Sequence, residues 1–178
     1  RPGLTTMHKA LAAVDRPTIA AIRGYCLGGG LEISLACDLR IAATDARIGL
    51  VEIRRGIMPG AGGSQRLPRL VGAANALKMA LTGEPIDAAE AYRIGLVNEV
   101  VEPGDLLPAA NRLAAAILKG APVSARFIKE AINKGLDLSL DEGLRLEADL
   151  AILLGQTEDS KEGPRSFVEK RPPVWQGK

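Results

Sequence analysis

Residues 17–38 read PTIAAIRGYCLGGGLEISLACD, and this stretch decides the fold. Its segment 18–22 is a short apolar run bounded by a glycine, which predicts a buried strand. The segment 29–37 begins in a triple glycine and is apolar on almost every face, which is typical of a buried helix. Glu32 lies inside that helix, where a carboxylate is costly unless it has partners. Glu32 is therefore the first candidate for a functional residue.

The composition of the 178-residue chain is that of an ordinary globular protein, with 47% hydrophobic and 25% charged residues. Aromatic residues make up only 3%, so we expect an aliphatic core. The net charge of +2 is too small to indicate a nucleic acid or an anionic membrane as partner. No apolar run reaches the roughly 18 residues of a membrane span, and no secretory signal is visible.

Cys26 and Cys37 are the only cysteines of the sequence. Two thiols do not form a disulfide framework, and no Cys/His cluster has the spacing of a metal site. We interpret both as small buried hydrophobic residues and predict no metal. The single histidine, His8, is expected on the surface.

The first 104 residues alternate short apolar strands with helices, which predicts a parallel α/β core. Asp87 and Glu90 have the spacing of a capping box at the start of a helix. The further elements expected here are helices at 7–14, 73–81 and 88–94 and strands at 39–43, 47–50 and 96–101.

From Asp105 onward the pattern is helical almost without interruption. Pro122 begins one helix, Ser139 with Glu142 caps another, and 157–170 forms the last. We therefore expect two parts, a partial α/β core at 1–104 and a helical region at 105–178.

The glycines 28–30 are compatible with a tight turn or with a backbone anion hole at the start of a helix. They match neither G-x-G-x-x-G nor the P-loop. Glu32 itself is a weak candidate for a capping-box glutamate, because that motif needs Ser or Thr where Gly29 stands. An anion hole beside a buried acid is the outline of an active site.

Glu52 is the second candidate carboxylate, and it precedes the glycine-rich segment 60–63. One alternative is an exposed residue on an edge strand. If the return of a strand instead brings Glu52 to Glu32, two converging carboxylates do not both ionise readily. One then serves as base and the other as acid, which suits the addition or removal of water across a double bond.

A serine nucleophile is not supported, because no G-x-S-x-G elbow surrounds Ser34, Ser64 or Ser124. Arg66 and Arg69 lie three residues apart on one helix face. Such a pair could bind phosphate, although surface or inter-subunit ion pairs are the more common use.

Taken together, these segments resemble the enoyl-CoA hydratase/isomerase (crotonase) superfamily. The resemblance covers essentially the whole chain and implies an α/β fold of the ClpP/crotonase-like β-β-α spiral type, here incomplete at its N-terminus, with a helical C-terminal region. The stretches that carry it are 17–38, PGAGGSQRLPR at 59–69, LTG at 81–83, AAEAYRIGLV at 88–97 and FVEKR at 167–171.

The resemblance implies roles for six residues of this chain. Glu32 and Glu52 match the two catalytic glutamates that activate water and exchange a proton with the substrate α-carbon. Gly29, with Gly28 beside it, matches the backbone donor to the thioester oxyanion. The remaining two are Gly60, a substrate-site glycine of the loop beside the glutamates, and Lys170, a lysine that contacts the CoA phosphate.

The implied function is syn hydration of a 2-enoyl-CoA thioester to a 3-hydroxyacyl-CoA, in fatty-acid or branched-chain acyl-CoA catabolism. Coenzyme A is part of the substrate, and no separate cofactor, membrane or nucleic acid is expected. The implied assembly is a trimer or a dimer of trimers, in the bacterial cytoplasm or the mitochondrial matrix. The alternatives are an enoyl-CoA isomerase, which needs one carboxylate, and an RNA-binding or non-catalytic subunit.

Family members also carry an N-terminal segment with no counterpart in the printed sequence, which supplies the second oxyanion N–H and much of the adenine pocket. We therefore expect the printed chain to be a fragment of a longer protein; the alternative is a truncated, inactive form. We expect the fragment alone to be inactive.

Overall fold

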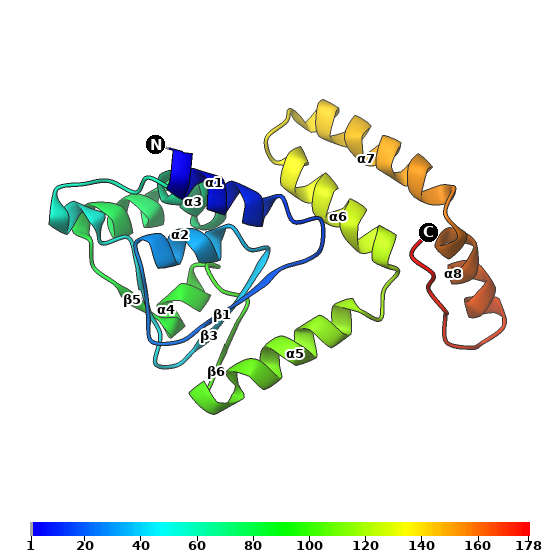
Figure 1. Ribbon diagram of the computed structural model, residues 1–178, viewed down its shortest axis with the longest axis horizontal. Helices are drawn as coiled ribbons and strands as arrows, with labels where there is room; N and C mark the ends of the chain where they lie inside the picture. Colours follow the sequence, from blue (N-terminus) through cyan, green and yellow to red (C-terminus); the bar gives the residue numbers. More distant parts are fainter. Residues whose placement is uncertain (1) are drawn as a thin grey trace. The chain divides into compact units, whose positions relative to one another are not determined.

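The computed structural model describes residues 2–178, with side chains from Thr6 onward, as two compact units (Figure 1). Of the described residues, the first unit comprises 2–14 and 18–112, and the second comprises 15–17 and 113–178. The division falls inside helix α5 (Leu106–Ile117).

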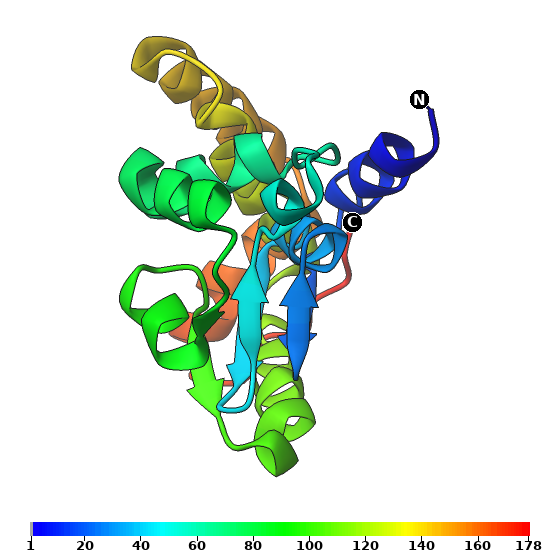
Figure 2. The ribbon, with the colours of Figure 1, turned by 90° about the vertical axis from the view of Figure 1, so that its left-hand side faces the viewer.

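Two small sheets form the frame of the first unit. Strands β1 (Ile19–Ile22), β3 (Leu39–Ala43) and β6 (Glu99–Val101) pair in parallel in the order β1-β3-β6. Figure 2 shows β1 and β3 as neighbouring blue and cyan arrows. The second sheet has the order β2-β4-β5, formed by β2 (Tyr25–Leu27), β4 (Arg47–Gly49) and β5 (Ile86–Asp87), with β2 parallel and β5 antiparallel to β4.

The predicted parallel α/β core is confirmed, and β3 has the predicted bounds. Strands β2 and β5 escaped prediction because they have only three and two residues, too few for a period-two pattern. The second sheet is therefore a finding of the structure.

Helix α2 (Gly29–Leu35) lies where the sequence predicts it and packs against β2 and helix α3 (Gly63–Thr82). The sequence predicts only the end of α3, because Gly72 interrupts the helix with a φ of 78° and a ψ of 157°. The other helices of this unit are α1 (Pro2–Ala12), α4 (Ala88–Arg93) and the short 3₁₀ segments η1 (Glu52–Arg55) and η2 (Pro103–Asp105).

The core of the first unit is aliphatic, as predicted, and its largest fully buried hydrophobic side chains are leucines and isoleucines of β3, β4, α2, α3 and adjoining loops. Cys26 belongs to this core, and burial raises the pKa of its thiol. The prediction for His8 is wrong, because α1 packs on α2 and only 2% of the histidine is exposed.

Arg40 is a buried arginine on β3 whose guanidinium meets main-chain carbonyls. It donates to the carbonyls of Cys37 at 2.7 Å, Leu96 at 2.8 Å and Ser34 at 3.3 Å. Burial lowers the pKa of Arg40. The side chain thus satisfies carbonyls at the end of α2, the helix that carries Glu32.

The second unit is built from helices α6 (Pro122–Gly135), α7 (Leu140–Gly155) and α8 (Glu158–Val168). The capping box of Ser139 and Glu142 is confirmed at the start of α7. After α8 the chain returns along that helix, where Asp159 accepts hydrogen bonds from the N–H groups of Gln176 at 2.6 Å and Gly177 at 2.9 Å. No helix of the described residues is long and apolar enough to cross a membrane.

Candidate active site

Glu32 is held by a loop that is distant from it in sequence. Its side chain is only 4% exposed, and its Oε1 accepts hydrogen bonds from the N–H of Ala61 at 2.7 Å and of Gly63 at 2.8 Å. Hydrogen bonds from main-chain N–H groups stabilise a carboxylate and fix its orientation. One oxygen is thus anchored, which leaves Oε2 for other chemistry.

The loop needs glycine at 63 because space there is already taken. A Cβ on Gly63 would lie 3.0 Å from Leu50 Cδ2, 3.0 Å from Pro59 Cβ and 3.1 Å from Glu32 Oε1. Any side chain at this position therefore displaces the carboxylate or its neighbours. The preceding Gly62 has a φ of 116°, which side chains rarely adopt.

Glu52 is buried at the first position of η1, with 8% of the residue exposed. The alternative of an exposed residue on an edge strand is therefore wrong. Its Oε1 lies against Gly28, where an added Cβ would come within 3.2 Å. Among the described residues, no donor or acceptor contacts Oε2 of Glu52, although that atom is buried. A buried polar atom without a partner is costly, which marks Oε2 of Glu52 as a candidate functional atom.

Gly28 connects the two glutamates. Its carbonyl accepts the N–H of Glu32 at 3.0 Å, one turn along α2, while its missing side chain leaves room for Glu52. The two carboxylates therefore flank the start of one helix. The N–H of Gly28 donates to the Gly49 carbonyl at 2.9 Å, so what Gly28 offers this site is space.

The next glycine provides the free donor. Gly29 opens α2 and is exposed, and among the residues that the structure describes no acceptor meets its N–H. The N–H groups of a first helical turn have no partner within the helix and attract negative charge. Gly29 is thus the more suitable of the two glycines to contact an oxyanion.

The other two predicted residues make no hydrogen bond to Glu32 or Glu52 among the described residues. Gly60 is exposed in the loop that leads to Ala61, and no atom approaches its virtual Cβ closer than 4.0 Å. Lys170 belongs to the second unit, directly after α8, with a φ of 53°. Their roles remain predictions.

Sequence reasoning missed two arginines that support the site. Arg40 holds the end of α2, and Arg66 donates from Nη1 to the Ala61 carbonyl at 3.1 Å, a role not predicted for it from the sequence. For Arg40 a signal existed, because both faces of a strand in a parallel sheet are buried. For Arg66 the only signal was the pair Gly62-Gly63, which ends three residues earlier and leaves room for a long side chain.

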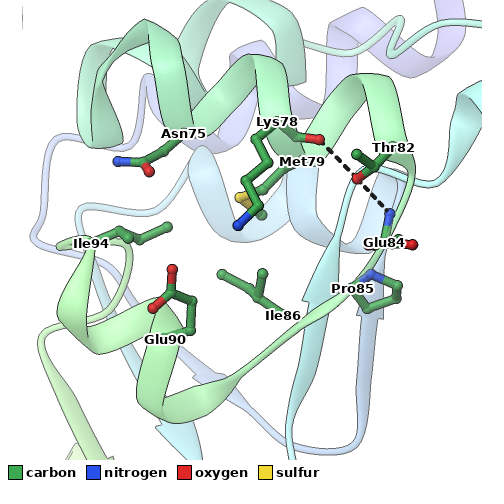
Figure 3. A pocket seen from close by; sticks show the side chains of 9 residues that line it. All are labelled: Asn75, Lys78, Met79, Thr82, Glu84, Pro85, Ile86, Glu90 and Ile94. Atoms are coloured by element: carbon green, nitrogen blue, oxygen red, sulfur yellow. Dashed lines mark hydrogen bonds between the residues drawn. The ribbon is translucent and has the colours of Figure 1, made fainter.

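A separate cavity of about 120 Å³ lies between the second half of α3, β5 and α4 (Figure 3). Lys78 and Glu90 point into it from opposite helices. Glu90 is paired with Arg93, which lowers the pKa of this carboxyl. Neither Glu32 nor Glu52 lines the cavity, so it is distinct from the candidate active site. Within residues 6–178, no three His, Cys, Asp or Glu side chains form a group that could hold a metal ion.

The arrangement is a crotonase-type α/β fold, as comparison with solved structures shows. An enoyl-CoA hydratase from Bacillus anthracis matches with a TM-score of 0.96 at 43% identity, over 98% of this chain and 68% of that one. A Geobacillus kaustophilus enoyl-CoA hydratase subunit matches with a TM-score of 0.94 at 44% identity, over the same shares.

The chain belongs to the enoyl-CoA hydratase/isomerase family, whose model matches residues 1–178. It is 45% identical to the crotonyl-CoA hydratase of Syntrophomonas wolfei over 93% of this chain and 64% of the relative. It is 50% identical to a probable enoyl-CoA hydratase of Mycobacterium bovis, over 92% and 63%. The chain therefore spans just under two thirds of the length of these curated relatives.

Proposed function

We propose that the chain carries the acid–base site of an enoyl-CoA hydratase, which adds water to a 2-enoyl-CoA thioester. The proposal rests on one observation: two buried carboxylates lie beside the N-terminus of α2, and they differ in their hydrogen-bond partners. Glu32 has two main-chain donors on one oxygen, whereas Glu52 has a buried oxygen with no partner among the described residues. Acid–base addition requires one group that takes a proton and one that gives it.

In the proposed reaction, Oε2 of Glu32 removes a proton from water, and the oxygen of that water bonds to C3 of the substrate. The C2–C3 π electrons move to the thioester oxygen, which the N–H of Gly29 stabilises as an enolate. Glu52 then gives its proton to C2 as the enolate collapses. The product is the 3-hydroxyacyl thioester, and transfer of the proton from Glu32 to Glu52 restores the site.

The test is hydration of a 2-enoyl-CoA such as crotonyl-CoA by the protein at its natural length. Glu32→Gln and Glu52→Gln should each lower kcat by about 10³-fold, within the usual range for loss of a general acid or base. Glu84→Gln is the matched control, because Glu84 is exposed and has only a 3.8 Å ion pair with Arg54. Near wild-type hydration by both site variants would refute the assignment.

The competing hypothesis is an enoyl-CoA isomerase. The preferred substrate distinguishes an isomerase from a hydratase. An isomerase moves a proton with one carboxylate, so the presence of both Glu32 and Glu52 favours hydration. We expect turnover of the 2-enoyl thioester to exceed that of the 3-enoyl thioester. The opposite order would assign the site to isomerisation.

The proposed partners are the acyl-CoA substrate and further copies of the same chain. In support of self-association, the helices of the second unit expose large aliphatic side chains, among them Ile132, Leu136, Leu140 and Ile152. Lys170 is the proposed contact to the CoA phosphate. Light scattering tests the assembly, for which we expect a trimer or a dimer of trimers and which a monomer would contradict.

A further inference from the structure

Arg66 has an unusual position for an arginine near a helix start. A Cβ on Gly62 would lie 2.1 Å from Nη1 and 3.1 Å from Cζ of Arg66, so the guanidinium occupies the space that any side chain at 62 would need. Nη1 donates to the Ala61 carbonyl at 3.1 Å. Among the described residues, no carboxylate lies within 4 Å of this guanidinium.

The main chain that Arg66 holds is the one that holds Glu32. Ala61 gives its carbonyl to Arg66 and its N–H to Glu32 Oε1 at 2.7 Å. Two residues later, the N–H of Gly63 reaches the same oxygen at 2.8 Å. The backbone N–H of Arg66 also donates to the Gly62 carbonyl at 2.8 Å. Arg66 therefore contacts the loop twice. Its side chain donates to the Ala61 carbonyl, and its backbone N–H donates to the Gly62 carbonyl.

We propose that Arg66 is a positioning residue for Glu32. By holding the Ala61 carbonyl and covering Gly62, its guanidinium keeps the N–H groups of Ala61 and Gly63 directed at Glu32 Oε1. The effect of Arg66 on hydration rests on the proposed function, whereas its effect on the loop does not.

Lysine cannot replace arginine fully in this role. An ammonium on a flexible stem can reach one carbonyl, but it lacks the planar group that covers a glycine. Arg66→Lys should therefore restore part of what Arg66→Met removes. The matched control is Arg69→Met, because Arg69 is exposed one turn later and donates to the Gln65 carbonyl at 2.9 Å, away from the loop.

The structural test measures amide hydrogen exchange at Ala61 and Gly63 in the protein at its natural length. Arg66→Met should speed exchange at both amides by at least about tenfold, because lost hydrogen bonds open local structure. Arg66→Lys should give a smaller increase, and Arg69→Met none. Unchanged exchange in both Arg66 variants would overturn the proposal. If Arg66→Met does not fold, Arg66→Lys alone decides by the same criterion.

The kinetic test separates positioning of the carboxylate from binding of the thioester. Arg66→Met should lower kcat for hydration by about 10- to 100-fold, the cost of misplacing a catalytic group, with KM within about twofold. Faster amide exchange with unchanged kcat would overturn the positioning role. If the wild-type protein does not hydrate enoyl thioesters, the proposed function fails, and amide exchange alone decides whether Arg66 positions Glu32.

Discussion

Glu32 in the first unit and Glu162 in the second are both carboxylates with hydrogen-bond donors, yet their donors differ in charge. Glu32 accepts from two neutral main-chain N–H groups. Glu162 accepts from the Arg171 guanidinium at 2.9 Å and from the Val174 N–H at 2.8 Å. Arg171 lowers the pKa of Glu162 to about 2.

The difference shows that a fold can hold a carboxylate either with a charged donor or with neutral donors, and that the two have different consequences. A guanidinium balances the charge of a carboxylate and keeps it ionised. Glu162 thereby holds the C-terminal tail against α8 through Arg171 and Val174. Neutral main-chain donors fix the place of an oxygen without a full opposite charge. Glu32 is therefore oriented through Oε1 by neutral donors, which leaves Oε2 for the role proposed above.

Among substitutions that keep the charge of the residue, the largest expected effect comes from shortening the side chain of Glu32 by one methylene group. Glu32→Asp keeps the charge but withdraws it from the N–H groups of Ala61 and Gly63, so kcat for hydration should fall by about 100-fold, the cost of a misplacement near 1 Å. Glu162→Asp should leave kcat unchanged. Steady-state assays measure kcat of both variants. Equal kcat values for Glu32→Asp and Glu162→Asp would show that the N–H groups of the loop do not position Glu32.

Arg40 and Arg93 extend the same comparison to arginines. Arg40→Met removes the donor to the buried Leu96 carbonyl and to the part-buried Cys37 carbonyl, which should lower the free energy of unfolding by about 2 kcal/mol. Arg93→Met removes only an exposed ion pair with Glu90, and should leave the free energy of unfolding close to that of the wild type. Urea denaturation measures both. Equal decreases in the free energy of unfolding would mean that Arg40 does not stabilise the end of α2.

Gly63→Ala tests the packing of the loop on Glu32. The new Cβ would come within 3.1 Å of Glu32 Oε1 and 3.0 Å of Leu50 Cδ2, so kcat should fall by about tenfold through a shift of a fraction of an ångström. Gly104→Ala is the control, because no atom lies within 4 Å of its virtual Cβ. A fully active Gly63→Ala would indicate that the loop adjusts without moving the carboxylate.

The smallest effect concerns acid and the tail of the second unit. Because folding lowers the pKa of Glu162 from 4.5 to about 2, its contribution to stability is complete above pH 4.5 and is lost as the pH falls toward 2. Trp175, whose Nε1 donates to the Lys119 carbonyl at 2.8 Å, reports on the tail by its fluorescence. The transition in this range should disappear in Glu162→Gln and persist in Glu147→Gln, an exposed control. Identical pH profiles of Glu162→Gln and Glu147→Gln would show that Glu162 does not hold the tail.

Much of the fold could be predicted from the sequence because its signals are local. The apolar run of β3, the helix that carries Glu32 and the cap at Ser139 each depend on residues adjacent in the chain. The approach of Glu52 to the helix that carries Glu32 could only be stated as a possibility, because it depends on how β4 pairs with β2.

What escaped prediction depends on contacts between distant segments. The burial of His8 follows from packing of α1 on α2, which no periodicity near a chain end reveals. The partner of Arg66 is a carbonyl of a loop whose conformation depends in turn on Glu32. The half-formed capping box at Asp87 shows the same limit, because Glu90 turns to Arg93 instead of the Asp87 backbone.

The most direct test compares hydration of crotonyl-CoA with exchange of the α-proton of a saturated acyl-CoA in D₂O, for the wild type, Glu32→Gln and Glu52→Gln. We predict that Glu32→Gln loses about 10³-fold in hydration but keeps α-proton exchange within about tenfold, because Glu52 remains. Glu52→Gln should lose both reactions. Exchange that survives in Glu52→Gln, or that falls as far as hydration in Glu32→Gln, would contradict the division of roles between the two carboxylates.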